Sequence, residues 1–195
     1  MNKYELLGQF QTFGRDLFLM GINNSHSGNI SHCARGGRGT LTITRSGAML
    51  GNIAIGDLIE TTLARNEFSD KNASRELVVH RAIYETGSCS AIIHSHPPSA
   101  IALSLKTDII RPIDAEGGYY FPEGIKVIDA KTAVASPEVA AKIAPLLKHE
   151  KVVVVRGHGS FAVGKNLEEC FLYTTVLESV CKVILNYAIL AGVVL

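Results

Sequence analysis

The stretch Ser90-Ala91-Ile92-Ile93-His94-Ser95-His96-Pro97-Pro98 carries the signal that decides the fold. Its apolar half predicts a buried β-strand, and the proline pair ends that strand because proline has no backbone N–H to donate. Residues two apart on a strand point to the same side, so His94 and His96 can reach one point. Sites in α/β folds commonly lie at strand ends. The stretch therefore indicates an α/β protein with a paired-imidazole site, although surface or hydrogen-bonded histidines give the same pattern.

Outward from this stretch, short strands and helices fill the chain. Short strands mixed with helices, one of them long and terminal, predict a three-layer α/β sandwich. No internal repeat or Pro/Ser-rich linker divides the sequence, so residues 1–195 are expected to form a single domain. The expected elements are a helix at 3–20, strands at 30–33 and 41–44 joined by a glycine turn at 36–39, a helix at 74–86, strands at 90–94 and 126–129, a helix starting at Ser136-Pro137-Glu138, a strand at 151–155, and a closing helix from Asn166 or Leu167 to about Leu190.

The composition predicts a globular protein rather than a disordered or nucleic-acid-binding one. Apolar residues make up 47% of the 195 residues and charged residues 19%, which supports a hydrophobic core. Nineteen Lys and Arg against eighteen Asp and Glu leave a net charge of +1. A dedicated nucleic-acid binder would carry a basic excess. We therefore expect no nucleic-acid partner.

The sequence also favours a soluble, cytoplasmic chain. Its four cysteines have neither regular spacing nor a C-x-x-C pair, which favours reduced thiols. The N-terminus lacks the uninterrupted apolar run of a signal peptide. The apolar stretch 176–195 is interrupted by Glu178, Lys182 and Asn186 at spacings of four, so one stripe of its helix is polar. This pattern predicts a buried amphipathic helix and no membrane partner.

Two further segments carry metal-ligating residue types. Arg156-Gly157-His158-Gly159-Ser160 follows the strand 152–155, and its two glycines let the backbone place the imidazole freely. Ser74-Arg75-Glu76 begins a helix, where Ser74 is expected to cap and Glu76 to lie in the first turn. Alone, Glu76 is best explained as an ordinary helix N-terminal acid. Together, three histidines and one carboxylate have the composition of a catalytic metal site.

Six segments, in their order and spacing, carry a resemblance to a known family. They are Ser27-Gly28-Asn29-Ile30-Ser31, Thr44-Arg45-Ser46-Gly47, Ser74-Arg75-Glu76, His94-Ser95-His96-Pro97, Arg156-Gly157-His158-Gly159 and Gly164-Lys165-Asn166-Leu167-Glu168-Glu169. In these segments the sequence resembles the class II aldolase/adducin family, and within it the L-fuculose-1-phosphate aldolase branch. The resemblance extends from about residue 5 to residue 185. It implies a three-layer α/β/α sandwich around a central, mainly antiparallel sheet.

The resemblance also implies a metal-dependent lyase. One divalent metal per subunit, Zn²⁺ with Mn²⁺ or Co²⁺ as alternatives, would be held by His94, His96, His158 and, in the resting state, Glu76. Substrate would displace Glu76, which would then act as the catalytic acid or base at the carbon that becomes nucleophilic. The implied reaction is reversible cleavage of a ketose 1-phosphate, such as L-fuculose 1-phosphate, to dihydroxyacetone phosphate and a short aldehyde such as lactaldehyde.

By the same resemblance, the substrate phosphate would be bound by glycine backbone, hydroxyl and amide groups. Arg75 stands where the bacterial branch has a serine, and its guanidinium can bind phosphate or carboxylate in a bidentate way. An Arg75 side chain that points to solvent remains the alternative. The expected substrate-binding residues are Gly28, Asn29, Ser46, Gly47, Ser74 and Arg75.

Relatives are cyclic homotetramers with active sites between subunits, so the same assembly is expected here. The tyrosine that a neighbouring subunit supplies in the bacterial branch has no clear counterpart in this sequence. The candidates for the acid or base on the aldehyde side are Asp114, Glu116, Tyr119 and Tyr120.

Arg75 and the missing tyrosine leave other reactions open. Decarboxylation, dehydration and sugar-phosphate 4-epimerisation are alternatives on the same scaffold. An adducin-like interaction module without catalysis is disfavoured, because such a module has no need of an open metal shell.

The remaining histidines receive separate interpretations. His80 is expected to be a satisfied buried histidine, and His149 a surface residue. His26 and His32 flank the predicted phosphate loop, and contact with substrate is an open alternative for His26.

Overall fold

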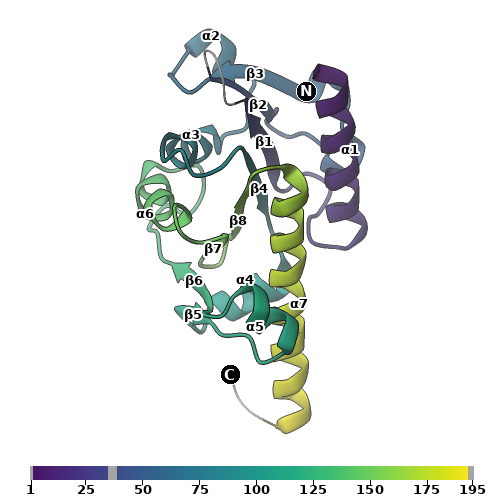
Figure 1. Cartoon of the computed structure of the whole chain (residues 1–195), viewed down its shortest axis with the longest axis vertical. Coiled ribbons are helices and arrows are strands. Elements are labelled where there is room, and N and C mark those ends of the chain that lie inside the picture. Colours follow the sequence, from purple (N-terminus) through teal and green to yellow (C-terminus); the bar gives the residue numbers. More distant parts are fainter. Residues whose placement is uncertain (1, 35–38, 193–195) are drawn as a thin grey trace.

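An eight-stranded sheet runs through the centre of the computed structural model, which describes residues 2–34 and 39–192 (Figure 1). The strands are β1 (Asn29–Cys33), β2 (Thr40–Thr44), β3 (Leu58–Thr62), β4 (Ala91–Ser95), β5 (Ile109–Ile110), β6 (Ile125–Ile128), β7 (Val152–Val155) and β8 (Gly159–Gly164). Their order is β3-β2-β1-β4-β8-β7-β6-β5. Every neighbouring pair is antiparallel except β6 and β7. The mainly antiparallel sheet that the resemblance implies is confirmed.

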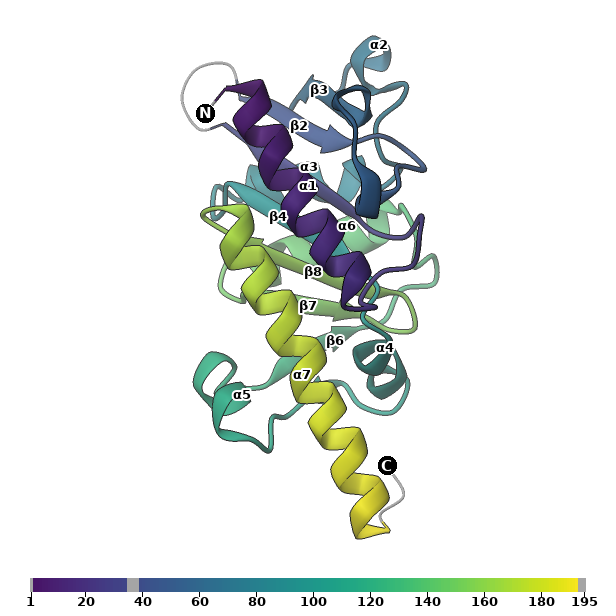
Figure 2. The ribbon, with the colours of Figure 1, turned by 90° about the vertical axis from the view of Figure 1, so that its right-hand side faces the viewer.

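Helices cover both faces of this sheet. They are α1 (Lys3–Leu19), α2 (Glu67–Asp70), α3 (Leu77–Glu85), α4 (Pro98–Ser104), α5 (Ala115–Tyr120), α6 (Pro137–Leu147) and α7 (Leu167–Ala191), with single 3₁₀ turns η1 (Leu50–Asn52) and η2 (Ile55–Asp57). Helices α1 and α7 lie side by side on one face, where α4 and α5 pack on α7 (Figure 2). Helices α3 and α6 pack together on the opposite face (Figure 1). The predicted three-layer sandwich is confirmed.

Strand β4 is buried on both faces, which explains its uninterrupted apolar run. Ile93 points into the core beneath α1 and α7, and its neighbour Ile92 points into the core beneath α3 and α6. Both side chains are fully buried. Burying an isoleucine contributes roughly 1.5–3 kcal/mol. Apolar packing therefore holds the central strand from both faces, without any contribution from the histidines at its end.

The predicted helix boundaries agree with the structure where a side chain caps the helix. Ser136 Oγ accepts a hydrogen bond from Val139 N at 3.1 Å, with Pro137 at the first helical position of α6. Asn166 Oδ1 accepts from Glu169 N at 2.9 Å and starts α7. The sequence indicates these helix starts because the capping group is the side chain of the residue itself.

The helix expected at 74–86 is shorter, and its cap differs from the prediction. Helix α3 begins at Leu77, with Glu76 as its N-cap residue instead of a first-turn residue. Ser74 forms a turn before the helix: its carbonyl accepts from Leu77 N at 3.0 Å, and its Oγ accepts from Glu76 N at 3.3 Å. The turn changes the direction of the chain just before the helix. The Glu76 side chain is buried, at 4% exposed.

The sequence prediction omits β3, α2, α4, β5, α5 and β8. Each is seven residues or shorter, too short for apolar periodicity to be distinctive. The predicted glycine turn at 36–39 lies outside the described residues except for Gly39, although β1 and β2 on either side of it do pair in antiparallel register.

Helix α7 is long and apolar enough to cross a membrane by length and composition alone. In the structure, its N-terminal part packs along the sheet through a buried stripe that includes Cys170, Leu177 and Cys181, as the amphipathic prediction requires. Its last turns extend past the sheet (Figures 1 and 2). Glu178, expected on the polar stripe, is 3% exposed.

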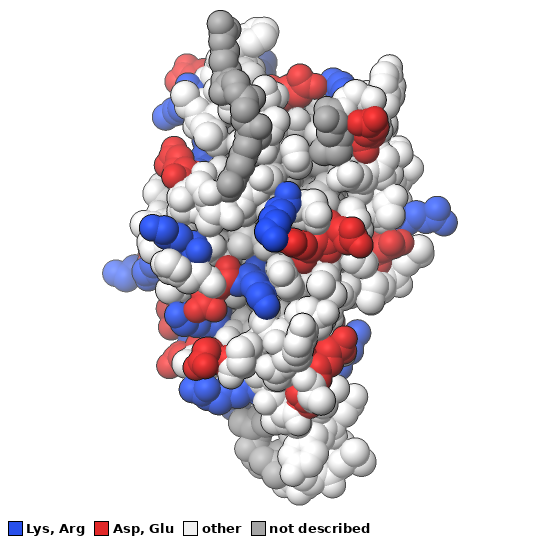
Figure 3. Space-filling model, in the orientation of Figure 1, with Lys and Arg blue, Asp and Glu red and all other residues white. Residues whose placement is uncertain are grey.

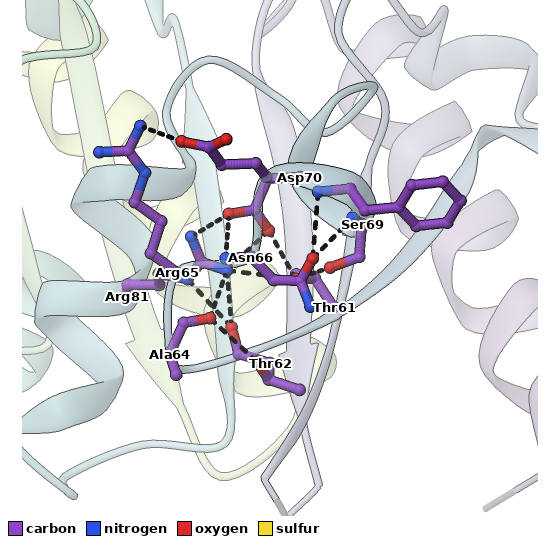
Figure 4. A network of polar contacts seen from close by, with 10 residues as sticks. Thr61, Thr62, Ala64, Arg65, Asn66, Ser69, Asp70 and Arg81 are labelled. Atoms are coloured by element: carbon purple, nitrogen blue, oxygen red, sulfur yellow. Dashed lines mark hydrogen bonds and ion pairs between the residues drawn. The ribbon is translucent and has the colours of Figure 1, made fainter.

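A network of hydrogen bonds connects Arg81 of α3 to the end of β3 and to residues 64–70 after it (Figure 4). The Arg81 guanidinium donates two hydrogen bonds of 2.7 Å to the Asp70 carboxylate. The same guanidinium donates to the carbonyls of Thr62 and Ala64, and the Thr61 hydroxyl donates to Asp70 at 2.6 Å. Hydrogen bonds from Arg81 lower the pKa of Asp70 well below its ordinary value, against the opposing effect of burial.

This network predicts a pH-dependent contribution to stability. A depressed pKa stabilises the fold above the unfolded-state pKa of about 4, and the stabilisation is lost as pH falls below that value. Asp70→Asn should lower the free energy of unfolding at pH 7 by about 1–2 kcal/mol, measured by urea denaturation. The difference from wild type should shrink progressively as the pH falls below about 4, toward the much lower folded-state pKa of Asp70.

The exposed pair Arg65–Glu67 supplies a matched control, since its atoms lie 3.5 Å apart in solvent. Glu67→Gln should leave stability unchanged within about 0.5 kcal/mol. Equal urea midpoints for the Asp70→Asn variant and wild type would contradict the role given to this network.

Candidate metal and substrate site

Three imidazoles converge at the ends of the neighbouring strands β4, β7 and β8. His94 and His96 lie at the end of β4, and His158 lies in the turn between β7 and β8. One ring nitrogen from each lies within 4.8 Å of the other two, and the Nε2 atoms of His94 and His96 are 3.0 Å apart. Nitrogens bound to one tetrahedral Zn²⁺ lie roughly 3.3 Å apart. The cluster therefore has the dimensions of a metal site.

The orientation of His94 is fixed by a backbone carbonyl. Its Nδ1 lies 3.0 Å from the carbonyl oxygen of Ser160, which can only accept a hydrogen bond. Nδ1 therefore carries the proton, and the Nε2 lone pair faces the other two histidines. Metal-ligating histidines commonly donate their second ring N–H in this way. The ring also stacks on Phe161, with centroids 4.2 Å apart.

All three histidines are held in the neutral state. Burial lowers the pKa of His94 well below its ordinary value, and His96 and His158 add to the effect. Burial and the neighbouring His158 lower the pKa of His96 to about 4, and burial lowers the pKa of His158. Three neutral nitrogen donors face one point at neutral pH.

Glu76 lies beside these histidines with one oxygen unused. Its Oε1 accepts a hydrogen bond from Ala135 N at 2.9 Å and lies 3.8 Å from His158 Nε2. Its Oε2 is buried and has no hydrogen-bond partner among the described residues. Burial raises the pKa of this carboxyl, against the opposing effects of the Ala135 N–H and the Arg75 charge. A buried, unpartnered carboxylate oxygen beside three neutral nitrogens fits a divalent cation.

The backbone contact to Glu76 gave no signal in the sequence. Ala135 has a φ of 51°, a left-handed conformation that costs energy for a residue with a Cβ. The strained residue directs its N–H at the Glu76 carboxylate. Nothing in an alanine side chain could have indicated this role.

All residues expected to bind metal or phosphate line one cavity of about 330 Å³. The cavity also contains His26, the open alternative from the sequence, as well as three residues not singled out as site residues. Of those three, Ser27 and Arg45 lie inside motifs that carry the family resemblance, whereas Val134 gave no signal in the sequence. The lining residues are His26, Ser27, Gly28, Asn29, Arg45, Ser46, Gly47, Ser74, Arg75, Glu76, His94, His96, Val134 and His158.

Glycine is structurally required at the floor of the cavity. Gly28 has a φ of 77°, and a Cβ there would lie 2.7 Å from the His94 carbonyl oxygen. The backbone of the loop thus approaches the end of β4 more closely than any side chain would permit. Next to it, the Asn29 side chain is buried, and its Oδ1 has no partner among the described residues.

Two arginines border the cavity, and they differ in availability. Arg45 forms an ion pair with Asp57 and donates from Nη1 to the Ser46 carbonyl at 3.1 Å. Arg75 is exposed and makes no hydrogen bond or ion pair with the described part of the chain. Its charge is therefore available to an anion, alongside the hydroxyls of Ser46 and Ser74. This part of the cavity suits a phosphate or carboxylate group.

The candidates for the aldehyde-side acid or base do not line this cavity. Asp114 caps α5 by accepting from Gly117 N at 2.9 Å, and Tyr120 packs against Tyr173 and Lys151. Tyr119 is 79% exposed. A role for any of these side chains in the site of a neighbouring subunit stays a prediction.

The other histidines differ in their surroundings. His80 is fully buried as expected, but only half satisfied: its Nδ1 lies 2.7 Å from Ser31 Oγ, whereas its Nε2 has no hydrogen-bond partner among the described residues. His32 lies on β1, outside the cavity, whereas His26 lies in its wall.

Comparison with known proteins shows the same architecture elsewhere. L-fuculose-1-phosphate aldolase from Thermus thermophilus has a similar structure, with a TM-score of 0.89 and 34% identity over 96% of both chains. A methylthioribulose-1-phosphate dehydratase from Acidiphilium cryptum is 30% identical over 171 residues, which cover 78% of this chain and 76% of that protein. An L-fuculose phosphate aldolase from Methanococcus maripaludis is 30% identical over 153 residues, covering 75% and 78%.

The length of the match varies among relatives. The chain spans 34% of a probable bifunctional methylthioribose-1-phosphate isomerase/methylthioribulose-1-phosphate dehydratase from Nocardia farcinica, at 28% identity. The family described as "Class II Aldolase and Adducin N-terminal domain" matches residues 9–185, nearly the whole chain. With its fold and site geometry, this chain belongs to the class II aldolase and adducin family.

Proposed function

We propose that this protein is a metal-dependent aldolase that reversibly cleaves a ketose 1-phosphate to dihydroxyacetone phosphate and a short aldehyde. The observation that carries the proposal is one cavity in which three neutral histidines and an unpartnered Glu76 oxygen lie beside an anion-binding loop. L-Fuculose 1-phosphate, with lactaldehyde as the product, is the substrate suggested by the similar aldolases.

The proposed chemistry divides between His94, His96, His158 and Glu76. The three histidines and, at rest, the carboxylate would hold a divalent ion, proposed to be Zn²⁺, with Mn²⁺ and Co²⁺ as alternatives. When bound, that ion supplies a Lewis acid that stabilises negative charge on the oxygen beside the breaking carbon–carbon bond. Glu76 would move the proton at the adjacent carbon, a role suited to a carboxyl whose pKa is raised by burial.

The substrate phosphate would be held away from the reacting carbon. Gly28 and Gly47 allow the backbone to approach an anion, and both have positive φ. Asn29, Ser46 and Ser74 supply amide and hydroxyl groups, and the available Arg75 guanidinium supplies charge. Holding the substrate at its phosphate orients its carbonyl for cleavage.

The decisive experiment measures release of dihydroxyacetone phosphate from a panel of ketose 1-phosphates, with and without a chelator. Wild type should release it only without the chelator. Glu76→Gln should retain metal, because the three histidines remain, while turnover falls by about 10²-fold or more. Turnover equal to wild type in this variant would contradict the role of Glu76. Glu67→Gln, on the exposed surface, is the matched control and should retain full turnover.

Dehydration is the second candidate, favoured by the similarity to the Acidiphilium dehydratase. Loss of water beside a carbonyl needs the same charge stabilisation and proton transfer, so the metal and Glu76 would serve it equally well. If metal-loaded protein releases no dihydroxyacetone phosphate, mass analysis of products from pentulose 1-phosphates decides for dehydration by a loss of one water.

Arg75 should act mainly on substrate binding. Arg75→Ser removes the available guanidinium but keeps a hydroxyl, so KM should rise about tenfold or more, with a smaller change in kcat. Steady-state kinetics at constant ionic strength measures both constants. The exposed Arg65 is the matched control, and Arg65→Ser should leave KM unchanged. An unchanged KM in Arg75→Ser would place that side chain in solvent.

We also propose a cytoplasmic homotetramer with active sites between subunits. The end of α7 extends from the body and exposes Tyr187, Ile189 and Leu190, apolar area that a partner subunit would cover. Charges of both signs are interspersed over the face in Figure 3, whereas that end carries mainly uncharged residues. Light scattering should give four times the chain mass, and a monomer would contradict the assembly.

A further inference from the structure

Glu178 is a buried carboxylate that the proposed reaction does not use. It lies on α7 and is 3% exposed. Its oxygens accept hydrogen bonds from Ser99 N at 3.1 Å, Ser99 Oγ at 2.8 Å and Ala100 N at 3.3 Å. The Lys182 ammonium lies 3.6 Å away at the solvent side and partly balances its charge. A buried charge with this many donors has a specific structural task, since its burial is otherwise unfavourable.

The donors that Glu178 satisfies belong to the first turn of α4. That turn begins with Pro97 and Pro98, which have no N–H, and Ile101 N donates to the Pro97 carbonyl at 2.9 Å. Glu178 thus accepts from both remaining N–H groups at this helix start. Because the carboxylate comes from α7, this neighbouring helix fixes the position of the first turn of α4.

His96 immediately precedes this proline pair, and the sheet does not hold it. Strand β4 ends at Ser95, so His96 lies one residue beyond the ladder. Its backbone N–H donates to Asn23 Oδ1 at 2.8 Å, which anchors it on one side. On the other side the chain passes through Pro97 and Pro98, whose rings restrict φ, into the turn held by Glu178.

We propose that Glu178 is a positioning residue for the metal ligand His96. The hydrogen bonds to Ser99 and Ala100 set the start of α4, and the stiff proline pair transmits that position to the imidazole. The inference rests on the proposed metal site. It predicts that Glu178 controls metal affinity and ligand geometry without touching the metal or substrate.

The test titrates metal-free protein with Co²⁺, following the visible d–d absorption for affinity and coordination geometry. Glu178→Ala should bind Co²⁺ about 10- to 100-fold more weakly than wild type, with an altered spectrum. Glu178→Gln keeps an oxygen for Ser99 but presents an NH₂ group toward Ala100 N, so its affinity should fall between the two. An altered spectrum at saturating Co²⁺ is not expected from a general loss of stability.

Thr174→Ala is the matched control, because Thr174 is also buried on α7 but, among the described residues, its hydroxyl bonds only to the Cys170 carbonyl of the same helix. It should lower the melting temperature while leaving Co²⁺ affinity and spectrum unchanged. Wild-type affinity and spectrum in Glu178→Ala would overturn the inference, and if that variant does not fold, the same result in Glu178→Gln would overturn it. Absence of stoichiometric Co²⁺ binding to wild type would instead overturn the proposed function along with it.

Discussion

The register of β4 against its two neighbours is the constraint on which the site depends. His94 stands opposite Asn29 of β1 and opposite Phe161 of β8. One backbone ladder therefore places the loop of Gly28 and Asn29, which we propose binds an anion, beside His94, the first of the proposed metal ligands. The other ladder places the turn with His158 beside the same histidine, because β8 begins directly after that turn. A shift of one residue in either ladder would turn His94 toward the opposite face.

Close packing of the backbone around the end of β4 explains why glycine recurs there. A Cβ on Gly159 would lie 2.4 Å from the Ser95 carbonyl oxygen, and one on Gly28 would lie 2.7 Å from the His94 carbonyl oxygen. The site is thus assembled by main chain that approaches β4 from both sides. Its imidazoles are buried by that approach, which keeps them neutral and able to bind a metal.

Sequence reasoning succeeded where a side chain or a periodic pattern carries the information. The strand before His94, the cap Ser136, the start of the last helix near Asn166, and the layered fold all follow from local patterns. It failed where the information lies in contacts between distant segments. Ala135 serves Glu76 through its N–H, and Glu178 interrupts an apolar helix because it bonds to α4, not because it faces solvent. Ser74 looked like a helix cap but forms the turn that precedes Glu76.

The distinction between local patterns and contacts of distant segments also bears on which reaction the scaffold could perform. Aldol cleavage and dehydration both need charge stabilised beside a carbonyl and one proton moved at the adjacent carbon. The ladders of β4 and the buried Glu76 supply groups suited to both, which agrees with similar identity to an aldolase and to a dehydratase. The difference between these reactions lies in what happens to the leaving group. We therefore infer that residues outside the β4 ladders distinguish the two reactions, and the segment around α5, predicted to act in the site of a neighbouring subunit, is the candidate for this role.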